Sequence, residues 1–444
     1  MKNQRAVSAE RLLQRIVEHS INAVKPSTPF EHKFHLTADK LNAFGYSIDL
    51  GNYREVKCVA IGKSAEAMAF EVKKKLDGRV NGIIATPVER HFDIEDFKFF
   101  HTGHPFPNEE SVKAGKAVRD FVAGSDEKDL LLFLISGGGS ASIFLPPEGV
   151  SLDDIKQMTK ALLDNGVSIW KINLIRRHLS VLGGGKLSAL APKQKKISLI
   201  ISDVAGDDVV SIASGPTVRD NTTPNDAYRL LEESGLKDKV PKSILPFLEK
   251  AGKDFAIPRF ENNVVRMIAS NADALSAAEK VGIENGFNTL VLTRFFEMDA
   301  ENAADFLVSI ARSIELEGNP VPAPALILLG GETTVRVKGN GKGGRNQHLV
   351  LTALRKLAAL SRNNSVLTRT LVFSFGTDGR DGNSDDSGAF ALLNTFEKVD
   401  GGLEEIERRI SSNDSNSFFR KYGGLITTGP TDTNVMDILG IIVA

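Results

Sequence analysis

Short apolar runs alternate along the chain with stretches in which apolar side chains recur every three or four positions. The runs predict buried strands, and the recurrence predicts helices that place one apolar face on a core. Strands are predicted at 57–62, 82–87, 130–135, 196–202, 266–269, 289–292, 325–329 and 370–375. Helices are predicted at 9–24, 65–76, 109–123, 152–165, 173–180, 272–284, 300–317 and 346–360. This alternation indicates an α/β fold with mainly parallel sheets.

The alternation is interrupted at residues 237–262, which contain three prolines and few β-branched residues. A chain of 444 residues is long enough for two or three domains. We therefore expect a domain boundary in this stretch, between an N-terminal domain of residues 1–245 and a C-terminal domain of residues 262–444.

The charge balance excludes several classes of partner. The 55 Lys and Arg residues nearly cancel the 56 Asp and Glu residues, so no net field attracts nucleic acid or an anionic membrane. The single cysteine, Cys58, excludes a disulfide framework. The first residues carry charges throughout, and the longest apolar runs, about eight residues, are too short to cross a bilayer. We expect a soluble cytoplasmic protein. The sequence does not reveal its oligomeric state, and a homo-oligomer is possible.

Two loops that follow predicted strands have the composition of anion sites. The segment 136–142 reads SGGGSAS after the strand LLLFLI, and such glycines leave backbone N–H groups to face an anion. Gly62-Lys63-Ser64 follows another strand, but Lys57 stands where a P-loop requires its first glycine, so this is not a P-loop. Lys63 is still placed to neutralise a phosphate or a carboxylate. The alternatives are a flexible turn and an exposed lysine at a helix start.

A third glycine-rich segment, residues 339–344, matches G-x-G-x-x-G between a predicted strand and a predicted helix. A dinucleotide site also needs an acidic residue about 20 positions later, and none occurs between Glu332 and Asp378. The eight Lys and Arg residues in that interval suit phosphates better than a ribose diol, and Arg345 is placed for a bidentate phosphate contact. The alternative is a solvated basic surface.

Acidic residues follow two further predicted strands, in the segments 376–388 and 202–208. The first begins like an EF-hand, but Asp386 and Leu392 replace the required glycine and glutamate. Such loops suit Mg²⁺ binding or a carboxylate base, and an Asx-rich turn is the alternative. Glycine loops, single cations and carboxylates at strand ends are the parts that phosphoryl transfer uses. His101 and His104 lack a third metal ligand, so we interpret them as turn residues.

The chain resembles the type II glycerate 2-kinases, the family with a C-terminal MOFRL domain, of which some members were formerly labelled hydroxypyruvate reductases. The resemblance runs nearly end to end. It rests on AIGKSAEAM (60–68), TGHPFPNEES (102–111), SGGGSAS (136–142), INLIRRHLS (172–180), ISDVAGDD (201–208), IASGPTV (212–218), GGETTVRVKGNGKGGRNQ (330–347), GTDGRDG (376–382) and TTGPTDTNVMD (427–437).

The resemblance implies phosphorylation of the 2-hydroxyl of D-glycerate by ATP with Mg²⁺. It implies two α/β domains with Rossmann-like sheets, a cleft between them, and a MOFRL region at residues 325–440. The implied catalytic residues are Lys63, Arg345, Asp203 and Asp378. The residues expected to bind substrate or phosphate are Ser136, Gly137, Gly138, Gly139, Ser140 and Arg176. Those expected to bind the nucleotide are Gly339, Gly341, Gly343, Gly344 and Asn346, and the metal candidates are Asp207 and Asp381.

One departure from the family pattern concerns a charge. Gly183 stands where the family usually has a lysine before two glycines, so Lys186 would have to supply that charge. Two rival functions stay open at this point. One is an NADPH-dependent hydroxypyruvate reductase, with arginines near residues 339–344 for the 2′-phosphate. The other is a protein that binds a sugar acid without catalysis.

Overall fold

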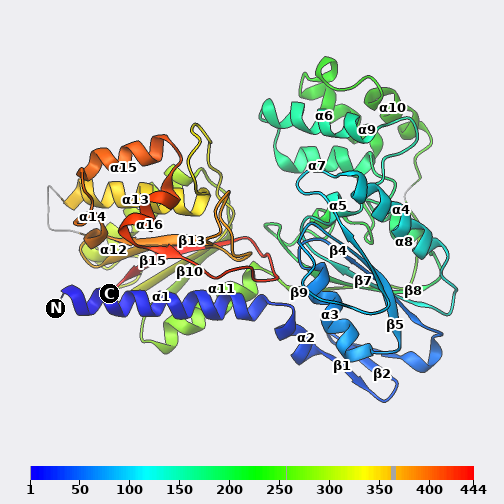
Figure 1. Ribbon diagram of the computed structural model, residues 1–444, viewed down its shortest axis with the longest axis horizontal. Coiled ribbons are helices and arrows are strands. Elements are labelled where there is room, and N and C mark those ends of the chain that lie inside the picture. The colour runs from blue at the N-terminus through cyan, green and yellow to red at the C-terminus, as the bar shows by residue number, and fades with distance from the viewer. Residues whose placement is uncertain (1, 257, 362–366) are drawn as a thin grey trace. The chain divides into compact units, whose positions relative to one another are not determined.

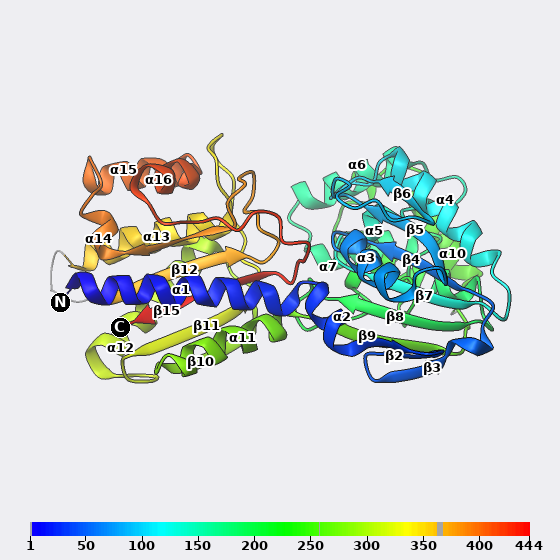
Figure 2. The same cartoon turned by 60° about the horizontal axis from the view of Figure 1, so that its bottom comes forward.

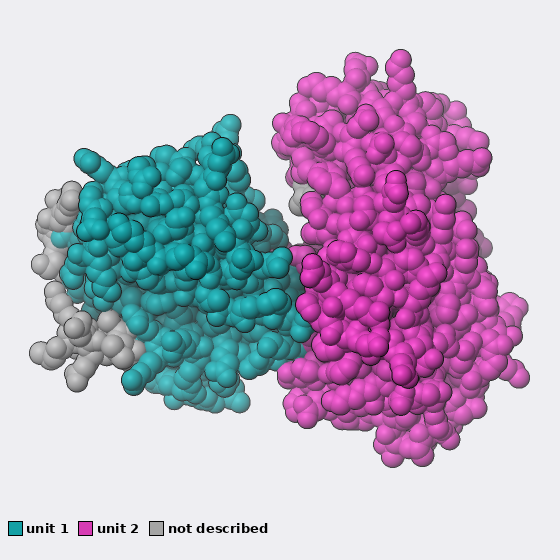
Figure 3. Space-filling view, viewed as in Figure 1, with its two compact units in different colours: residues 1–25, 269–444 teal, residues 26–268 magenta. Residues whose placement is uncertain are grey.

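The computed structural model describes residues 2–256, 258–361 and 367–444, and the chain divides into two compact units (Figures 1 and 3). Unit 1 comprises residues 1–25 and 269–444, and unit 2 comprises residues 26–268. This division differs from the expected boundary at 237–262. That stretch forms helix α10 (Ile244–Lys253), whose buried Ile244 and Leu248 belong to a core of unit 2. The N-terminal helix belongs with the C-terminal residues.

Unit 2 is built on a six-stranded sheet in the order β6-β5-β4-β7-β8-β9. Its strands are β4 (Val56–Ile61), β5 (Val80–Thr86), β6 (Phe97–His101), β7 (Leu130–Ile135), β8 (Lys195–Ile201) and β9 (Asn263–Ala269). The pairs from β6 to β8 are parallel, as the alternating pattern predicts. The register pairs Ile61 with Ile135, so the loops after β4 and β7 leave the sheet side by side.

The helices of unit 2 fall into two groups. Those next to the sheet are α3 (Ala65–Leu76), α4 (Glu109–Ala123), α5 (Gly139–Ser142) and α8 (Lys186–Ala189), with the 3₁₀ turn η2 (Ile212–Ser214). A separate helical core is formed by α10 with α6 (Leu152–Asp164), α7 (Ile169–His178) and α9 (Pro224–Glu233). Cys58 is buried in β4, and burial raises the pKa of its thiol, as expected for an inert core cysteine.

A small antiparallel sheet that the apolar pattern does not predict precedes β4. It contains β1 (Phe34–Thr37), β2 (Lys40–Ala43) and β3 (Tyr46–Asp49), between α2 (Ser27–Lys33) and the 3₁₀ turn η1 (Leu50–Asn52). Phe30, Phe34 and Phe44 form its aromatic core. A further 3₁₀ turn, η3 (Lys237–Lys239), precedes α10.

Unit 1 contains a second six-stranded sheet, in the order β10-β11-β15-β12-β13-β14. Its strands are β10 (Asn288–Phe296), β11 (Ala325–Gly331), β12 (Thr370–Gly376), β13 (Gly388–Leu392), β14 (Leu425–Ile426) and β15 (Asp437–Val443). Only β10 and β11 pair in parallel, so this sheet is mixed where we expected a mainly parallel one. The reason is that β15, between β11 and β12, and β13, between β12 and β14, each run antiparallel to both of their neighbours.

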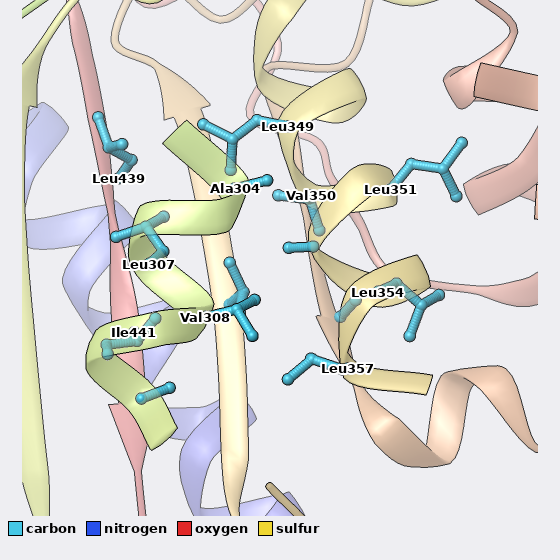
Figure 4. Close-up of a cluster of buried hydrophobic side chains, with 14 of the residues drawn as sticks. Ala304, Leu307, Val308, Leu349, Val350, Leu351, Leu354, Leu357, Leu439 and Ile441 are labelled. Atoms are coloured by element: carbon cyan, nitrogen blue, oxygen red, sulfur yellow. The ribbon is translucent and has the colours of Figure 1, made fainter. Parts of the chain in front are cut away.

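Helices cover both faces of this sheet (Figure 1). One face carries α1 (Lys2–Val24) and α11 (Asn271–Glu284), which pack on each other, and Figure 2 shows α1 extended along the sheet. The other face carries α12 (Ala300–Glu317) and α13 (Arg345–Ser361), whose apolar side chains meet those of β15 in the core shown in Figure 4. The shorter helices are α14 (Leu393–Phe396), α15 (Gly402–Ser411) and α16 (Ser415–Tyr422). Within the described ranges, no helix has both the length and the hydropathy that crossing a membrane requires.

Candidate functional site

In unit 2, backbone hydrogen bonds join the loops that follow β4 and β7. The Ser136 N–H donates to the carbonyl of Ile61 (3.0 Å), and the Lys63 N–H donates to the carbonyl of Gly137 (2.8 Å). The hydroxyl of Ser136 accepts a bond from the Ser64 N–H (3.0 Å). The SGGGS loop and the GKS loop, each expected to meet an anion, are therefore one connected structure.

The glycines of these loops are required by close contacts. A Cβ on Gly62, whose φ is +100°, would lie 2.4 Å from the Ser136 carbonyl oxygen. A Cβ on Gly137 would lie 1.7 Å from Oδ2 of Asp203, so the Asp203 carboxylate rests against the Gly137 backbone. At Gly138 it would lie 3.6 Å from Cγ of Lys63. The structure thus brings Lys63, Asp203 and the glycine loop together.

Two consecutive backbone donors of this loop are unpaired. Within the described part of the chain, the N–H groups of Gly137 and Gly138 donate to no protein acceptor, whereas that of Gly139 donates to the Ser136 carbonyl (3.2 Å). Adjacent unpaired N–H groups beside a lysine ammonium attract an anion. The anion cradle expected from SGGGS would use these two N–H groups, whereas Gly139 packs closely on Ala213.

The electrostatic balance at Asp203 bears on proton transfer. Burial raises the pKa of the Asp203 carboxyl group, and the nearby Lys63 ammonium opposes that shift. A carboxylate whose pKa is raised toward neutrality is a better proton acceptor than an exposed one. Asp207 lies in the same loop, half-buried, with a φ of +57°.

Sequence reasoning interpreted His104 as a turn residue, whereas the structure places its ring beside the loop. A Cβ on Gly138 would lie 3.1 Å from Cδ2 and 3.5 Å from Nε2 of His104. The signal in the sequence was the segment TGHPFPNEES, which carried the family resemblance although its spacing suggests no chemistry.

Arg176, on α7, lines a small cavity of unit 2. The cavity has a volume of about 10 Å³, room for the centre of about one water molecule, and Ser140, Phe144 and Ser214 line it with Arg176. Only 8% of Arg176 is exposed, and burial lowers the pKa of its guanidinium to about 10. Ser140, expected to bind substrate or phosphate, thus shares this wall with Arg176.

Lys186 does not lie in this cavity wall. Its ammonium donates to the carbonyls of Arg177 (3.3 Å) and Ser180, at the end of α7. Burial lowers its pKa to about 8, against the opposing effect of Asp220. We expected Lys186 to supply a charge to the site. Its ammonium instead holds the turn that follows Arg176 in place.

In unit 1, Arg345 begins α13 and is held by two carboxylates. Its Nε and Nη2 donate to Oδ2 (2.5 Å) and Oδ1 (2.9 Å) of Asp437, and its Nη1 lies 2.6 Å from Oε1 of Glu332. Burial would lower the pKa of Arg345, but Asp437 and Glu332 outweigh burial and raise it. A third of the side chain is exposed, so the guanidinium is a fixed charge at the surface of the unit.

Sequence reasoning missed Asp437. We searched for acids after strands, as a parallel sheet requires, and Asp437 is the first residue of a strand. Because β15 is antiparallel, its start pairs with the ends of its neighbours, Asp437 with Gly331 and with Gly376. The usable signal was an acid directly before the apolar run ILGIIV.

Asp378 lies at the same edge of the sheet. A Cβ on Gly376 would lie 3.3 Å from Oδ1 of Asp378 and 3.3 Å from Oδ1 of Asp437. Asp378 is half-buried, and its Oδ1 accepts the N–H of Arg380 (3.2 Å). The structure therefore brings Asp378 into the neighbourhood of the Arg345–Asp437 pair.

The glycine-rich loop 339–344, expected to bind the nucleotide, is packed against other loops. The N–H groups of Gly339, Gly341 and Gly343 donate to Asn413 Oδ1 (3.0 Å), the Ser412 carbonyl (3.0 Å) and Asn383 Oδ1 (2.8 Å). A Cβ on Gly344 would lie 2.3 Å from Oδ1 of Asp381. These glycines permit close packing, and the three donors are already used.

Asn346 and Asp381 are also occupied. The Asp381 carboxylate accepts the N–H groups of Asn346 (3.1 Å) and Gln347 (2.8 Å), so it caps the first turn of α13. The side chain of Asn346 bonds Asp381 and the hydroxyl of Ser374. Burial raises the pKa of Asp381 to about 7, against the effect of those N–H groups. Asp381, a metal candidate, and Asn346, a nucleotide candidate, thus both take part in the start of α13.

The donor set limits what metal this chain can hold. Among the described residues there is no group of three His, Cys, Asp or Glu side chains arranged to bind a metal. A site made entirely of protein ligands therefore does not fit. Mg²⁺ commonly takes one or two carboxylates together with water and substrate phosphates, and single carboxylates such as Asp207 fit that mode.

Comparison with known proteins identifies the family of this chain. Residues 12–249 match the family model described as a domain of unknown function, DUF4147, and residues 325–437 match the MOFRL family. A D-glycerate 2-kinase from Thermotoga maritima is 36% identical, with 98% of this chain and 99% of that protein covered. The crystal structure of a glycerate kinase from Thermotoga maritima superposes with a TM-score of 0.82 at 33% identity, covering 98% of this chain and 99% of that one.

A third relative carries a different name. A protein from Agrobacterium vitis named putative hydroxypyruvate reductase is 34% identical over 87% of each chain. Both family models and the coverage lead to one conclusion. The chain belongs to the type II glycerate kinase family and carries both a DUF4147 domain and a MOFRL domain.

Proposed function

We propose that the chain transfers the γ-phosphoryl group of ATP to the 2-hydroxyl of D-glycerate, giving 2-phosphoglycerate and ADP. The observation that carries this proposal is the junction of Lys63, Asp203 and two unpaired N–H groups, on a chain that belongs to the glycerate kinase family. Catalysis of this transfer is chiefly positioning and charge neutralisation. Those are the tasks that a lysine and unpaired backbone donors perform.

The roles follow from the chemistry of each group. A bond forms between the substrate oxygen O2 and the γ-phosphorus as the bond to the β–γ bridging oxygen breaks, and the hydroxyl proton passes to Asp203. Lys63 and the N–H groups of Gly137 and Gly138 neutralise phosphate oxygens. In unit 1, Arg345 is oriented by Asp437 and lies near Asp378. The family resemblance assigns Arg345 and Asp378 to the reaction, as a further fixed charge and as an alternative proton acceptor.

Mg²⁺ fits this proposal as a partner of the nucleotide. It would neutralise phosphate charge, with Asp207 as the protein ligand and with phosphate oxygens and water as the others. The engaged amides of residues 339–344 give no support to a dinucleotide site there. Because one relative is named a putative hydroxypyruvate reductase, the test below includes reductase activity as the alternative function.

The test supplies D-glycerate and Mg-ATP and couples the product to enolase alone, without phosphoglycerate mutase. Enolase acts on 2-phosphoglycerate, so a signal identifies phosphorylation at the 2-hydroxyl. ADP formation without that signal would contradict the 2-kinase assignment. Oxidation of NADPH with hydroxypyruvate, in the absence of ATP-dependent turnover, would favour the reductase. Lys63→Ala is the matched negative control.

A further inference from the structure

The guanidinium of Arg176 is buried without the partners that a buried cation needs. Its Nε and Nη2 have no hydrogen-bond acceptor among the described residues, although only 8% of the residue is exposed. Unpaired buried charges are costly and are normally compensated. The neighbouring Arg177, by contrast, pairs with Asp220 at 2.9 Å.

The two unpaired groups are a matched pair. Nε and Nη2 form the side-on fork of a guanidinium, whose two parallel N–H bonds fit the two oxygens of one carboxylate. The same chain uses this fork at Arg345, where Nε and Nη2 hold Oδ2 and Oδ1 of Asp437. Arg176 has the same two donors, but no carboxylate in the described part of the chain accepts a hydrogen bond from them.

The surroundings of the fork suit a small carboxylate. Ser140 and Ser214 supply hydroxyls to the cavity wall, and the Phe144 ring lies 6.0 Å from the guanidinium carbon. Ala213 and Ser214 hold positive φ angles of 51° and 61°, a backbone strain that is concentrated at ligand sites.

The cavity is close in sequence and space to the proposed reaction site. Ser140, in its wall, follows Gly138 by two residues, and Gly139 packs on Ala213, which also lines the cavity. In a 2-hydroxy acid the carboxylate and the hydroxyl are on adjacent carbons. A carboxylate held here would keep the hydroxyl of the same small molecule near the glycine loop.

We propose that the side-on fork of Arg176 binds the carboxylate of the acceptor acid and thereby makes the enzyme specific for 2-hydroxy acids over neutral polyols. This inference rests on the proposed kinase function for its substrate. Lys186 acts as a positioning residue, because its ammonium holds the turn that follows Arg176. Phosphate is the other oxyanion that a guanidinium could bind, and the test separates the two.

The kinetic test compares wild type with Arg176→Gln and Arg176→Lys. In Arg176→Gln we expect KM for D-glycerate to rise about 100-fold or more, with KM for ATP unchanged within about twofold. The preference for D-glycerate over glycerol should fall by a similar factor. Arg176→Lys keeps a charge without the fork and should recover only part of the loss. Arg229→Gln, at an exposed position on α9, is the matched control.

A rise in KM for ATP instead would assign Arg176 to a phosphate and overturn the proposal. Equal changes in both KM values with a lowered melting temperature would indicate a purely structural role and would also overturn it. So would an unchanged KM for D-glycerate in a folded variant.

A binding measurement separates this proposal from the kinase proposal. Calorimetry without nucleotide titrates D-glycerate, and in a parallel run inorganic phosphate, into wild type and Arg176→Gln. We expect D-glycerate to bind wild type and to lose that binding in the variant. If wild type binds D-glycerate through Arg176 without phosphorylating it, the kinase proposal alone fails. If phosphate binding is lost and D-glycerate binding is kept, the carboxylate proposal alone fails. Absence of both binding and turnover in wild type overturns both.

Discussion

Two glycine-rich loops, residues 136–140 after β7 and residues 339–344 before α13, have similar compositions and different hydrogen bonding. In the first, the N–H groups of Gly137 and Gly138 donate to no acceptor in the described chain. In the second, the N–H groups of Gly339, Gly341 and Gly343 donate to neighbouring loops. Both need glycine because other atoms come close. The comparison teaches that a glycine motif signals close packing, and that only unpaired donors make it an anion site.

The largest expected effect is a difference in kcat/KM between variants of two lysines, Lys63 beside the first loop and Lys342 in the second. Lys63→Ala should lower kcat/KM by about 10³-fold or more, about 4 kcal/mol, because a fixed charge on the phosphoryl group is lost. Lys342→Ala in the second loop removes an exposed ammonium 3.8 Å from Asp385 and should change kcat/KM less than about twofold. Initial rates and melting temperatures of both variants check this. An equal loss of kcat/KM in both variants would contradict the functional difference between the two loops.

The next effect concerns Asp437, which orients Arg345. Asp437→Asn should lower kcat/KM by about 10- to 100-fold, since the guanidinium loses its bidentate partner. The free energy of unfolding should fall by about 1–3 kcal/mol, because Asp437 is buried while Arg345 is partly exposed. Urea unfolding and initial rates measure the two quantities. Lowered stability with unchanged kcat/KM would show that the pair is structural alone.

A pH effect tests the cap on α13. The pKa of Asp381 is about 7 in the folded chain and 3.8 in the reference state, so the folded chain binds the proton more tightly between these values. Relative to Asp381→Asn, the free energy of unfolding of wild type should therefore decrease as pH rises from about 4 to about 7, by about 2–4 kcal/mol, and then level off. Denaturant unfolding of both proteins across this range measures it. A difference that stays constant with pH would contradict the raised pKa.

The smallest effect is expected at Asn383, which ties down the second loop. Its side chain accepts the Gly343 N–H and donates to the Gly341 carbonyl (3.1 Å). Asn383→Ala should cost about 1–2 kcal/mol of unfolding free energy, with KM for ATP changed less than about threefold. Chemical denaturation and nucleotide kinetics check it. An increase of tenfold or more in the KM for ATP would indicate that the second loop binds the nucleotide.

Much of the local structure was predictable. The predicted helices 65–76 and 109–123 and the strand 130–135 have the bounds of α3, α4 and β7. These elements carry strong local signals: α4 begins at a capping box between Asn108 and Ser111, and β7 is six consecutive apolar residues. Periodicity and caps depend on neighbours in sequence, so one sequence is enough to read them.

Features that depend on contacts between residues far apart in the sequence were not predictable. The apolar run 438–443 does not reveal that β15 enters between β11 and β12, and this insertion adds two antiparallel pairs to the sheet and brings Asp437 to Arg345. Likewise, nothing local says that the amide of Gly343 meets Asn383, 40 residues away. The proximity of Lys63 to the SGGGS loop was predictable, because the carboxyl ends of neighbouring strands in a parallel sheet lie at the same edge. This holds however far apart the strands are in the sequence.

The assignment of the N-terminal helix to unit 1 has a consequence for synthesis on the ribosome. The apolar stripe of α1, with Leu12, Leu13 and Ile16, is synthesised before unit 2, but its packing partner α11 is encoded roughly 250 residues later. At translation rates of about 5–20 residues per second, that stripe is without its partner for roughly 12–50 s. Meanwhile unit 2 is synthesised in full between the two parts of unit 1. The order of synthesis therefore lets unit 2 fold before unit 1 is complete, while the apolar stripe of α1 still lacks its partner.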